Sequence, residues 1–184
     1  MPYKYPVIDL FCGIGGLSHG FIKEKFKVIA GFDIDNSCKY PFEENNNAPF
    51  FADDLSVVSS DKINSLYPKN TTKILVGCAP CQAFSTYSQK NKSNDKWKML
   101  YTFSRIINDI KPQIVSMENV PNLRNYKKGK VLKDFTETLS SNGYHFNWYI
   151  IDCSDYGVPQ KRNRLILLAS KLGAINIVNP TSKI

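Results

Sequence analysis

The stretch Asp9-Leu-Phe-Cys-Gly-Ile-Gly-Gly16 decides the fold, because it joins a strand-like run to a helical pattern. The apolar run over residues 7–11 is typical of a buried strand, and residues 17–25 predict a helix. The three glycines between them allow the backbone to turn sharply and to approach a ligand closely. A strand, a glycine loop and a helix in this order predict the first unit of an α/β fold.

The glycine loop does not match a dinucleotide fingerprint. The third glycine of that pattern would fall on position 18, which is Ser18. The loop therefore favours a nucleoside-type cofactor whose amino-acid tail lies along the turn. Asp33 ends the next strand-like run, where an acid can bind both hydroxyls of a ribose. A plain turn followed by a solvated aspartate is the alternative.

The same alternation continues along the chain and predicts a mainly parallel, doubly wound sheet with helices on both faces. In such sheets, ligands bind beyond the carboxyl ends of the strands. The expected strands are residues 7–11, 27–33, 50–51, 73–77, 113–118, 144–151 and 164–169, and the expected helices are 17–25, 36–46, 56–66, 99–110 and 131–139.

Length and composition fit one folded domain of 184 residues, with 42% hydrophobic residues and a formal charge of +8. No apolar run reaches the roughly 18 residues of a membrane-spanning helix. The amino-terminal residues lack a signal-peptide core, and five cysteines is an odd number, so reduced thiols in a cytoplasmic protein are expected.

The charge is divided unevenly between two parts of the chain. Residues 1–60 carry five lysines against eight acids, a net charge of −3, whereas residues 61–184 carry nineteen basic against eight acidic residues, a net charge of +11. The basic part would suit a polyanion such as nucleic acid, and an ordinary lysine-rich surface explains it equally well.

Cys78 and Cys81 form a C-x-x-C pair directly after the fourth expected strand. A zinc site would need further ligands, and the chain has no second C-x-x-C and only two histidines, so no metal is expected. A redox pair lacks a thioredoxin-like context, and Cys78 fits a buried structural thiol. Cys81 lies on a proline-stiffened turn at the carboxyl end of a strand, where a thiolate would be an exposed nucleophile.

Four motifs in order closely resemble the DNA cytosine-5 methyltransferases over almost the whole chain. They are Asp9-Leu-Phe-Cys-Gly-Ile-Gly-Gly16, Pro80-Cys-Gln82 with Phe84-Ser85, Glu118-Asn-Val120 and Gln160-Lys-Arg-Asn-Arg164. The resemblance implies the Rossmann-like fold of S-adenosylmethionine-dependent methyltransferases, a mostly parallel doubly wound sheet with a terminal antiparallel strand.

The resemblance also implies which residues hold S-adenosylmethionine. Asp33 would bind the ribose and Asp54 the adenine amino group, with Asp53 as an adjacent rival for the second role. The full set implied to bind the cofactor is Phe11, Gly13, Gly15, Gly16, Asp33, Ile34, Asp54, Leu55, Pro80 and Leu100.

The implied catalytic residues are Cys81, Glu118, Arg162 and Arg164. The Cys81 thiolate would add to carbon 6 of a flipped cytosine, Glu118 would hold the base, Arg162 would stabilise its carbonyl oxygen and Arg164 would support the site. The loop over residues 84–98 is expected to close over double-stranded DNA, and the basic residues Arg124, Lys127, Lys128 and Lys130 are expected to extend that surface.

The resemblance implies a restriction-modification enzyme of which this chain is a part. Residues 1–170 would form the catalytic domain, and residues 171–184 would be a tail where a target-recognition region begins. The chain would be either one subunit of a split enzyme, whose second polypeptide supplies that region, or a truncated product. Two alternatives remain open, namely a tRNA cytosine-5 methyltransferase and a non-catalytic protein that binds adenosylmethionine or nucleic acid.

Overall fold

The computed structural model describes residues 3–80 and 95–180. Within these ranges, seven strands form a single sheet in the order β3-β2-β1-β4-β5-β7-β6. The strands are β1 (Pro6–Leu10), β2 (Lys27–Asp33), β3 (Phe50–Ala52), β4 (Ile74–Gly77), β5 (Ile114–Asn119), β6 (His145–Asp152) and β7 (Asn163–Ser170). The α-helices are α1 (Gly16–Lys23), α2 (Lys39–Asn46), α3 (Ser60–Ser65), α4 (Met99–Ile110) and α5 (Lys130–Ser141).

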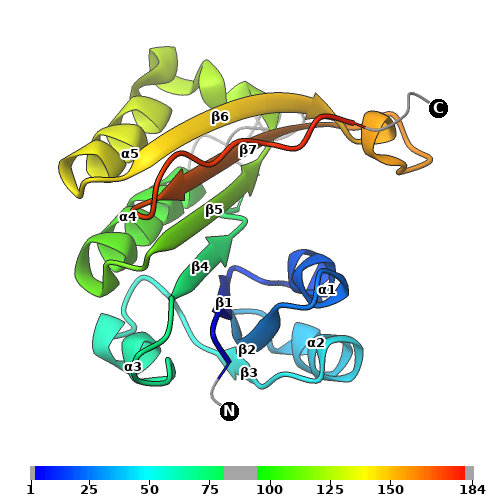
Figure 1. Cartoon of the computed structure of the whole chain (residues 1–184), viewed down its shortest axis with the longest axis vertical. Helices are drawn as coiled ribbons and strands as arrows, with labels where there is room; N and C mark the ends of the chain where they lie inside the picture. The colour runs from blue at the N-terminus through cyan, green and yellow to red at the C-terminus, as the bar shows by residue number, and fades with distance from the viewer. Residues whose placement is uncertain (1–2, 81–94, 181–184) are drawn as a thin grey trace.

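The topology confirms the expected doubly wound sheet. Strands β1 to β5 pair in parallel, and β7, the last strand of the chain, is antiparallel to both of its neighbours, β5 and β6. Helices α1 and α2 lie on one face of the sheet, and α3, α4 and α5 lie on the other (Figure 1). The chain reverses direction across the sheet between β1 and β4, which is where such folds bind ligands.

Two hydrophobic cores fill the space between the sheet and its helices. The larger joins the sheet to α3, α4 and α5, with Phe103 and Phe135 fully buried at its centre. The smaller joins β1, β2 and β4 to α1 and α2 around the fully buried Phe42. Both faces of the central strands are therefore covered, as a parallel sheet requires.

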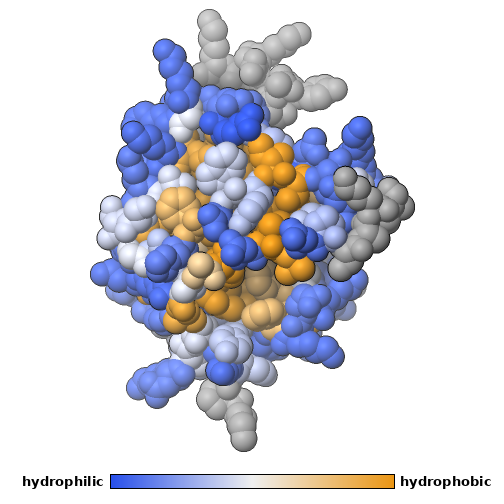
Figure 2. Space-filling view, turned by 45° about the horizontal axis from the view of Figure 1, so that its top comes forward, coloured by the Kyte–Doolittle hydropathy of each residue, from blue (hydrophilic) through white to orange (hydrophobic). Residues whose placement is uncertain are grey.

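One part of the sheet is covered differently. Leu165 and Leu167 of β7 pack into the larger core, so Ile166 and Leu168 point to the opposite face, where they are half-buried. Among the described residues no helix covers that face of β5, β7 and β6; instead an extended segment crosses it, held by Asn147 and Tyr149, which both donate to the Asn176 side chain. Figure 2 shows one face of the molecule on which hydrophobic side chains gather at the centre inside a hydrophilic rim.

Helix α3 is much shorter than the sequence predicts. The expected helix over 56–66 begins only at Ser60, because the Ser59 side chain caps it by accepting a hydrogen bond from the backbone of Asp61. The preceding residues form a turn in which the Asp54 carboxylate accepts from the backbone of Ser56. Helices α4 and α5 have 12 residues each, and none of the helices within residues 3–80 and 95–180 is long and apolar enough to cross a bilayer.

The packing against β2 makes a prediction about two glycines. A Cβ at Gly31 would lie 2.2 Å from Cζ of the buried Phe42 ring, so Gly31→Ala should lower the free energy of unfolding by about 2–3 kcal/mol. Gly20 is exposed inside α1, where a Cβ has nothing within 4 Å, so Gly20→Ala should raise the free energy of unfolding by about 1 kcal/mol. Urea denaturation of the two variants measures both changes, and a neutral Gly31→Ala would contradict the packing of Phe42.

Candidate active site

The glycine loop and the turn after β4 meet at the carboxyl edge of the sheet. Leu10, the last residue of β1, pairs with Gly77 at the end of β4, and the backbone of Cys78 donates to the Leu10 carbonyl at 3.3 Å. A cavity of about 360 Å³ opens beside this junction. Its walls are formed by Asp9, Phe11, Cys12, Gly13, Leu17, Cys78 and Glu118. Three predicted site residues, Phe11, Gly13 and Glu118, are therefore brought together.

The backbone of the glycine loop is strained at its start. Phe11 has φ of 57°, in the left-handed region that an aromatic residue rarely adopts, and its ring packs edge-on against Phe103. Gly13 has φ of 50°, and a Cβ there would have nothing within 4 Å. Gly15 differs, because its Cβ would lie 2.1 Å from Nδ2 of Asn46 in α2. Gly15 thus allows α2 to pack closely, whereas Gly13 leaves its side of the loop open.

Asp33 ties the glycine loop to the end of β2. Its Oδ2 accepts a hydrogen bond from the backbone of Gly13 at 2.9 Å, and its Oδ1 accepts from the backbone of Asp35 at 3.0 Å. Each carboxylate oxygen can accept a further hydrogen bond, so Asp33 is still able to bind a hydroxyl pair. Its neighbour Ile34 is 70% exposed at the same edge, as a residue that packs on a ligand would be.

Asp9 is a buried carboxyl that the sequence reasoning did not select. It is fully buried in β1, its Oδ2 accepts from the Ser18 hydroxyl at 2.7 Å, and its Oδ1 has no hydrogen-bond partner among the described residues. Desolvation raises the pKa of Asp9 to about 7, against the lowering effect of the Ser18 hydrogen bonds. The signal was present in the sequence, since an acid inside an otherwise apolar strand is rare without a partner or a function.

Glu118, at the end of β5, is held by two side chains. Its Oε1 lies 2.5 Å from Nε of Arg164, and its Oε2 accepts from the Cys78 thiol at 2.7 Å. Glu118 pairs across the sheet with Ile166, and Arg164 is two residues away on the same face of β7. Two predicted catalytic residues therefore form an ion pair that is mostly shielded from solvent.

Of the other two predicted catalytic residues, the structure describes Arg162 but not Cys81. Arg162 is exposed just before β7, where its backbone donates to the Asp152 carboxylate at 3.3 Å. Cys81 and most of the loop over 84–98 lie outside the described residues. The buried Asn119 donates from Nδ2 to the carbonyl of Ala79 at 3.0 Å, which anchors the chain two residues before Cys81.

The residues predicted around the adenine fall into two groups. Asp54 is exposed, and hydrogen bonds from Ser56 lower the pKa of its carboxyl. The rival Asp53 is paired with Lys62 at 2.6 Å, which leaves Asp54 as the better candidate. The predicted Leu55 and Leu100 are buried in the larger core, and Pro80 is half-buried at the last described position before the gap.

The described cysteines are scattered. Cys12, Cys38, Cys78 and Cys153 are not joined to one another by disulfides, and burial raises the pKa of Cys12 well above its usual range. Across residues 3–80 and 95–180, no three histidine, cysteine, aspartate or glutamate side chains come together as metal ligands would.

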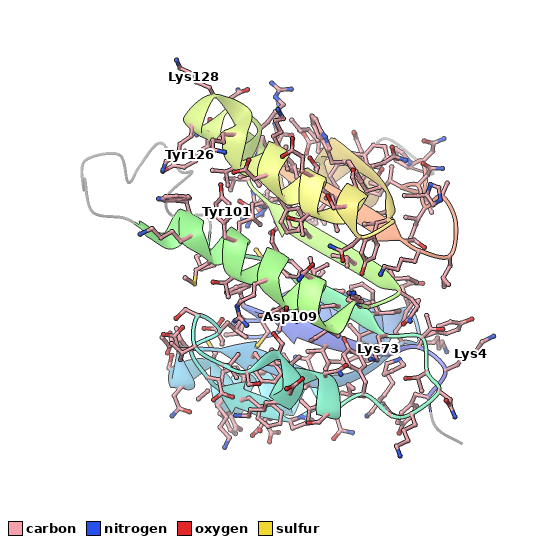
Figure 3. All side chains as sticks on the ribbon, turned by 90° about the vertical axis from the view of Figure 1, so that its left-hand side faces the viewer. Lys4, Lys73, Tyr101, Asp109, Tyr126 and Lys128 are labelled. Carbon is pink, nitrogen blue, oxygen red and sulfur yellow. The ribbon has the colours of Figure 1, made fainter. Side chains whose placement is uncertain are left out.

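A basic turn follows β5 at the carboxyl edge of the sheet. Arg124, Lys127, Lys128 and Lys130 are all exposed. Lys127 and Lys128 have φ of 48° and 59°, an unusual left-handed pair for residues other than glycine. The Lys127 ammonium lies 3.3 Å from the centre of the Trp97 ring, just before α4, and Lys130 pairs with Asp134 at 3.0 Å. In Figure 3, Tyr126 is drawn just above Tyr101 of α4, and Lys128 lies farther out, at the top of the view.

Comparison with known proteins gives a family for this arrangement. The model of the C-5 cytosine-specific DNA methylases matches residues 5–183. The type II methylase M.HgiDII of Herpetosiphon aurantiacus is 51% identical over 95% of this chain and 49% of its own length. The type II methyltransferase M.DsaV of Dactylococcopsis salina is 33% identical over 88% of this chain and 44% of its own length. The chain therefore spans about half the length of the curated relatives it matches.

Solved structures share the fold. The Entamoeba histolytica methyltransferase EhMeth superposes with a TM-score of 0.77 at 24% identity, over 98% of this chain and 58% of that one. The Dnmt2 methyltransferase of S. pombe superposes with a TM-score of 0.73 at 16% identity, over 95% of this chain and 52% of that one. These likenesses confirm the methyltransferase fold that the sequence predicted.

The buried Asp9 predicts how stability depends on pH. Its pKa is about 7 in the folded protein and near 4 in the unfolded chain, so between these values the folded state holds more protons. The free energy of unfolding should therefore fall as pH rises from 4 to 7, by about 4 kcal/mol at most, and level off above that. Asp9→Asn stays neutral and should lack this loss. Urea denaturation between pH 4 and pH 8.5 compares the two proteins, and parallel pH profiles would contradict the prediction.

Proposed function

The chain belongs to the C-5 cytosine-specific DNA methylase family, and on that premise we propose that it is the catalytic part of an enzyme that methylates carbon 5 of cytosine in DNA. The observation that carries this proposal is the Glu118 carboxylate, which Arg164 and Cys78 hold at the wall of the cavity beside the glycine loop. A carboxylate fixed there can accept a hydrogen bond from the exocyclic amine of a cytosine, and a second one from the adjacent ring nitrogen once that nitrogen carries a proton.

The residues around the cavity fit S-adenosylmethionine as the methyl donor. The cofactor carries an ammonium group, and Asp9 offers a buried Oδ1 with no partner among the described residues. Gly13 leaves room for a close approach, Phe11 supplies an aromatic wall, and Asp33 retains acceptor positions for a ribose. When bound, the cofactor supplies an electrophilic methyl group on a sulfonium. Ile34 and Asp54 would hold its adenine at the exposed edge.

Carbon 5 of cytosine is a poor nucleophile, and Cys81 would overcome this. Its thiolate would form a bond to carbon 6, so that the ring electrons move to carbon 5. The ring nitrogen would take up a proton as electron density builds on the ring, Glu118 would accept a hydrogen bond from that N–H, and Arg162 would donate to the carbonyl oxygen. The ring nitrogen would give the proton up again when the ring is restored. Once carbon 5 carries the methyl group, loss of its proton and breakage of the sulfur–carbon bond would restore the ring and the thiolate.

The target atom is inaccessible inside a duplex, so the cytosine would have to be flipped into the cavity. The basic turn, with Arg124, Lys127, Lys128 and Lys130, lies at the same edge of the sheet and would contact the phosphates that flank the flipped base. Its positive charge belongs to the +11 part of the chain. DNA is therefore proposed as the partner of this edge.

A role in restriction-modification is proposed from the relatives, which are named as type II methylases. The assignment of residues 1–170 to the catalytic domain and of 171–184 to the start of a recognition region stays a prediction. Since the relatives are about twice as long, the proposed enzyme would need the recognition region from elsewhere, as part of a longer protein or as a second polypeptide.

The covalent step gives the central test. Cys81→Ser should abolish transfer of a labelled methyl group from adenosylmethionine to DNA by the complemented enzyme, because serine is a far weaker nucleophile toward carbon 6. Calorimetric binding of adenosylmethionine to the same variant should stay within about twofold of wild type, since Cys81 is not placed among the cofactor ligands. Retained methyl transfer in Cys81→Ser would overturn the nucleophile. Greater transfer to tRNA than to DNA would overturn the substrate.

The basic turn predicts how DNA binding depends on salt. Lys127 covers Trp97 and Lys130 pairs with Asp134, so Arg124 and Lys128 can be replaced without losing those contacts. The double variant Arg124→Ala/Lys128→Ala should weaken DNA binding and reduce the slope of log affinity against log salt by about 2.

Lys23 and Lys25 provide the matched control, because they are exposed at the opposite edge of the sheet, before β2. Lys23→Ala/Lys25→Ala should leave the salt slope unchanged. Fluorescence anisotropy with a labelled duplex measures both variants between 50 and 200 mM salt. Equal slopes for the two double variants would show that the basic turn does not contact DNA.

A further inference from the structure

The Glu118 carboxylate is fixed by a pair of unlike donors. Arg164 approaches Oε1 with Nε at 2.5 Å, and Cys78 approaches Oε2 with its thiol at 2.7 Å. A carboxylate can rotate about its last side-chain bond, and a contact to one oxygen alone leaves that rotation partly free. Contacts to both oxygens, from β7 on one side and from the end of β4 on the other, fix the plane of the carboxylate.

Cys78 is not a core thiol. It is only half-buried, it follows directly after β4, and its side chain lines the same cavity as Glu118, Phe11 and Gly13. Its backbone is held by the Leu10 carbonyl, so its position is set by the pairing of β1 with β4. The position of the Cys78 thiol therefore depends on the junction of β1 and β4 that forms the site. Through its hydrogen bond, the thiol also fixes the position of the Glu118 side chain.

The two donors leave room for a base. An ionised carboxylate has about four acceptor positions, and Arg164 and Cys78 use one on each oxygen. Among the described residues nothing occupies the second position on either oxygen, and these positions match the exocyclic amine of a cytosine and its ring nitrogen in the protonated form. A thiol is a weak donor, so it orients Oε2 without competing strongly for the charge that Glu118 must share with the base.

We propose that Cys78 is a positioning residue for the methylation reaction: its thiol, together with Arg164, holds Glu118 in the orientation in which the carboxylate meets the flipped cytosine. This role rests on the proposed function of the chain. It also separates the two members of the C-x-x-C pair, because Cys81 would react with the base whereas Cys78 would act through Glu118 and form no bond to carbon.

Two substitutions at Cys78 separate a hydrogen-bonding role from a packing role. Cys78→Ala removes the donor and should lower kcat for DNA methylation about tenfold, the effect of one lost orienting hydrogen bond, with KM for adenosylmethionine within twofold of wild type. Cys78→Ser keeps a donor and should stay within about threefold of wild type. Cys38→Ala, at a thiol that does not line the cavity, is the control for loss of a cysteine. Thermal melts confirm that each variant is folded.

The contact itself can be measured without turnover. The S–H stretching band of Cys78, identified in infrared spectra by its loss in Cys78→Ser, should shift to higher frequency in Glu118→Gln, because a neutral amide oxygen is a weaker acceptor than a carboxylate. The bands of the other thiols should not move.

Each result decides a different part of the proposal. Equal loss of kcat in the alanine and serine variants, or wild-type kcat in Cys78→Ala, would overturn the positioning role. An unshifted band in Glu118→Gln would overturn the hydrogen bond on which that role depends. Absence of methyl transfer in the complemented wild-type protein would instead overturn the proposed function, and the role of Cys78 with it, while a shifted band would still report the contact.

Discussion

The close parallel pairing of β1 with β4 is the constraint on which the site depends. At its carboxyl end the pair brings Leu10 beside Gly77, and a Cβ on Gly77 would lie 2.9 Å from the Leu10 carbonyl and 3.1 Å from the Phe103 ring. Only glycine fits between them without a shift. Because the helices after β1 and after β4 lie on opposite faces, the two loops diverge here and leave a cavity between them. The glycine loop, Cys78 and, one strand further, Glu118 are all placed by this junction.

The same junction concentrates unfavourable features that a purely structural region would avoid. Phe11 holds a left-handed backbone conformation, and Asp9 is buried with one oxygen that has no hydrogen-bond partner within residues 3–80 and 95–180. Each feature costs stability in the free protein, and each would be relieved or used by a cationic ligand. A bound ammonium near Asp9 would favour its ionised form, so cofactor binding would be linked to proton release near neutral pH. Backbone strain and a buried carboxyl with a raised pKa, found together at one place, are typical of a binding site.

Much of the fold could be predicted from the sequence, because the spacing of apolar residues and the turn residues between the apolar runs determine the helices and strands locally. The seven strands and the doubly wound order needed only apolar runs and the turns between them, and the shortened α3 shows where local capping by Ser59 overrode the pattern. The resemblance implied separate roles for Glu118 and Arg164 but not their ion pair, because residues 46 positions apart meet only through strand register.

Other contacts of the site depend on side-chain packing, which the spacing of residues along the sequence does not reveal. The sequence analysis predicted a structural role for the Cys78 thiol, because nothing in the sequence shows that this side chain contacts Glu118. The choice between Asp53 and Asp54 likewise needed the position of Lys62, which pairs with Asp53 and leaves its neighbour exposed. The division of charge along the chain gains a meaning from these contacts. The acidic first third contributes Asp9, Asp33 and Asp54 to the side that would hold a cationic cofactor, and the basic remainder contributes Arg164 and the turn that would face a polyanion. A cationic cofactor and anionic DNA bound side by side need an acidic surface and a basic surface that are separated from each other. The switch between β1 and β4 separates those surfaces, and Glu118, an acid held by an arginine, lies where they meet.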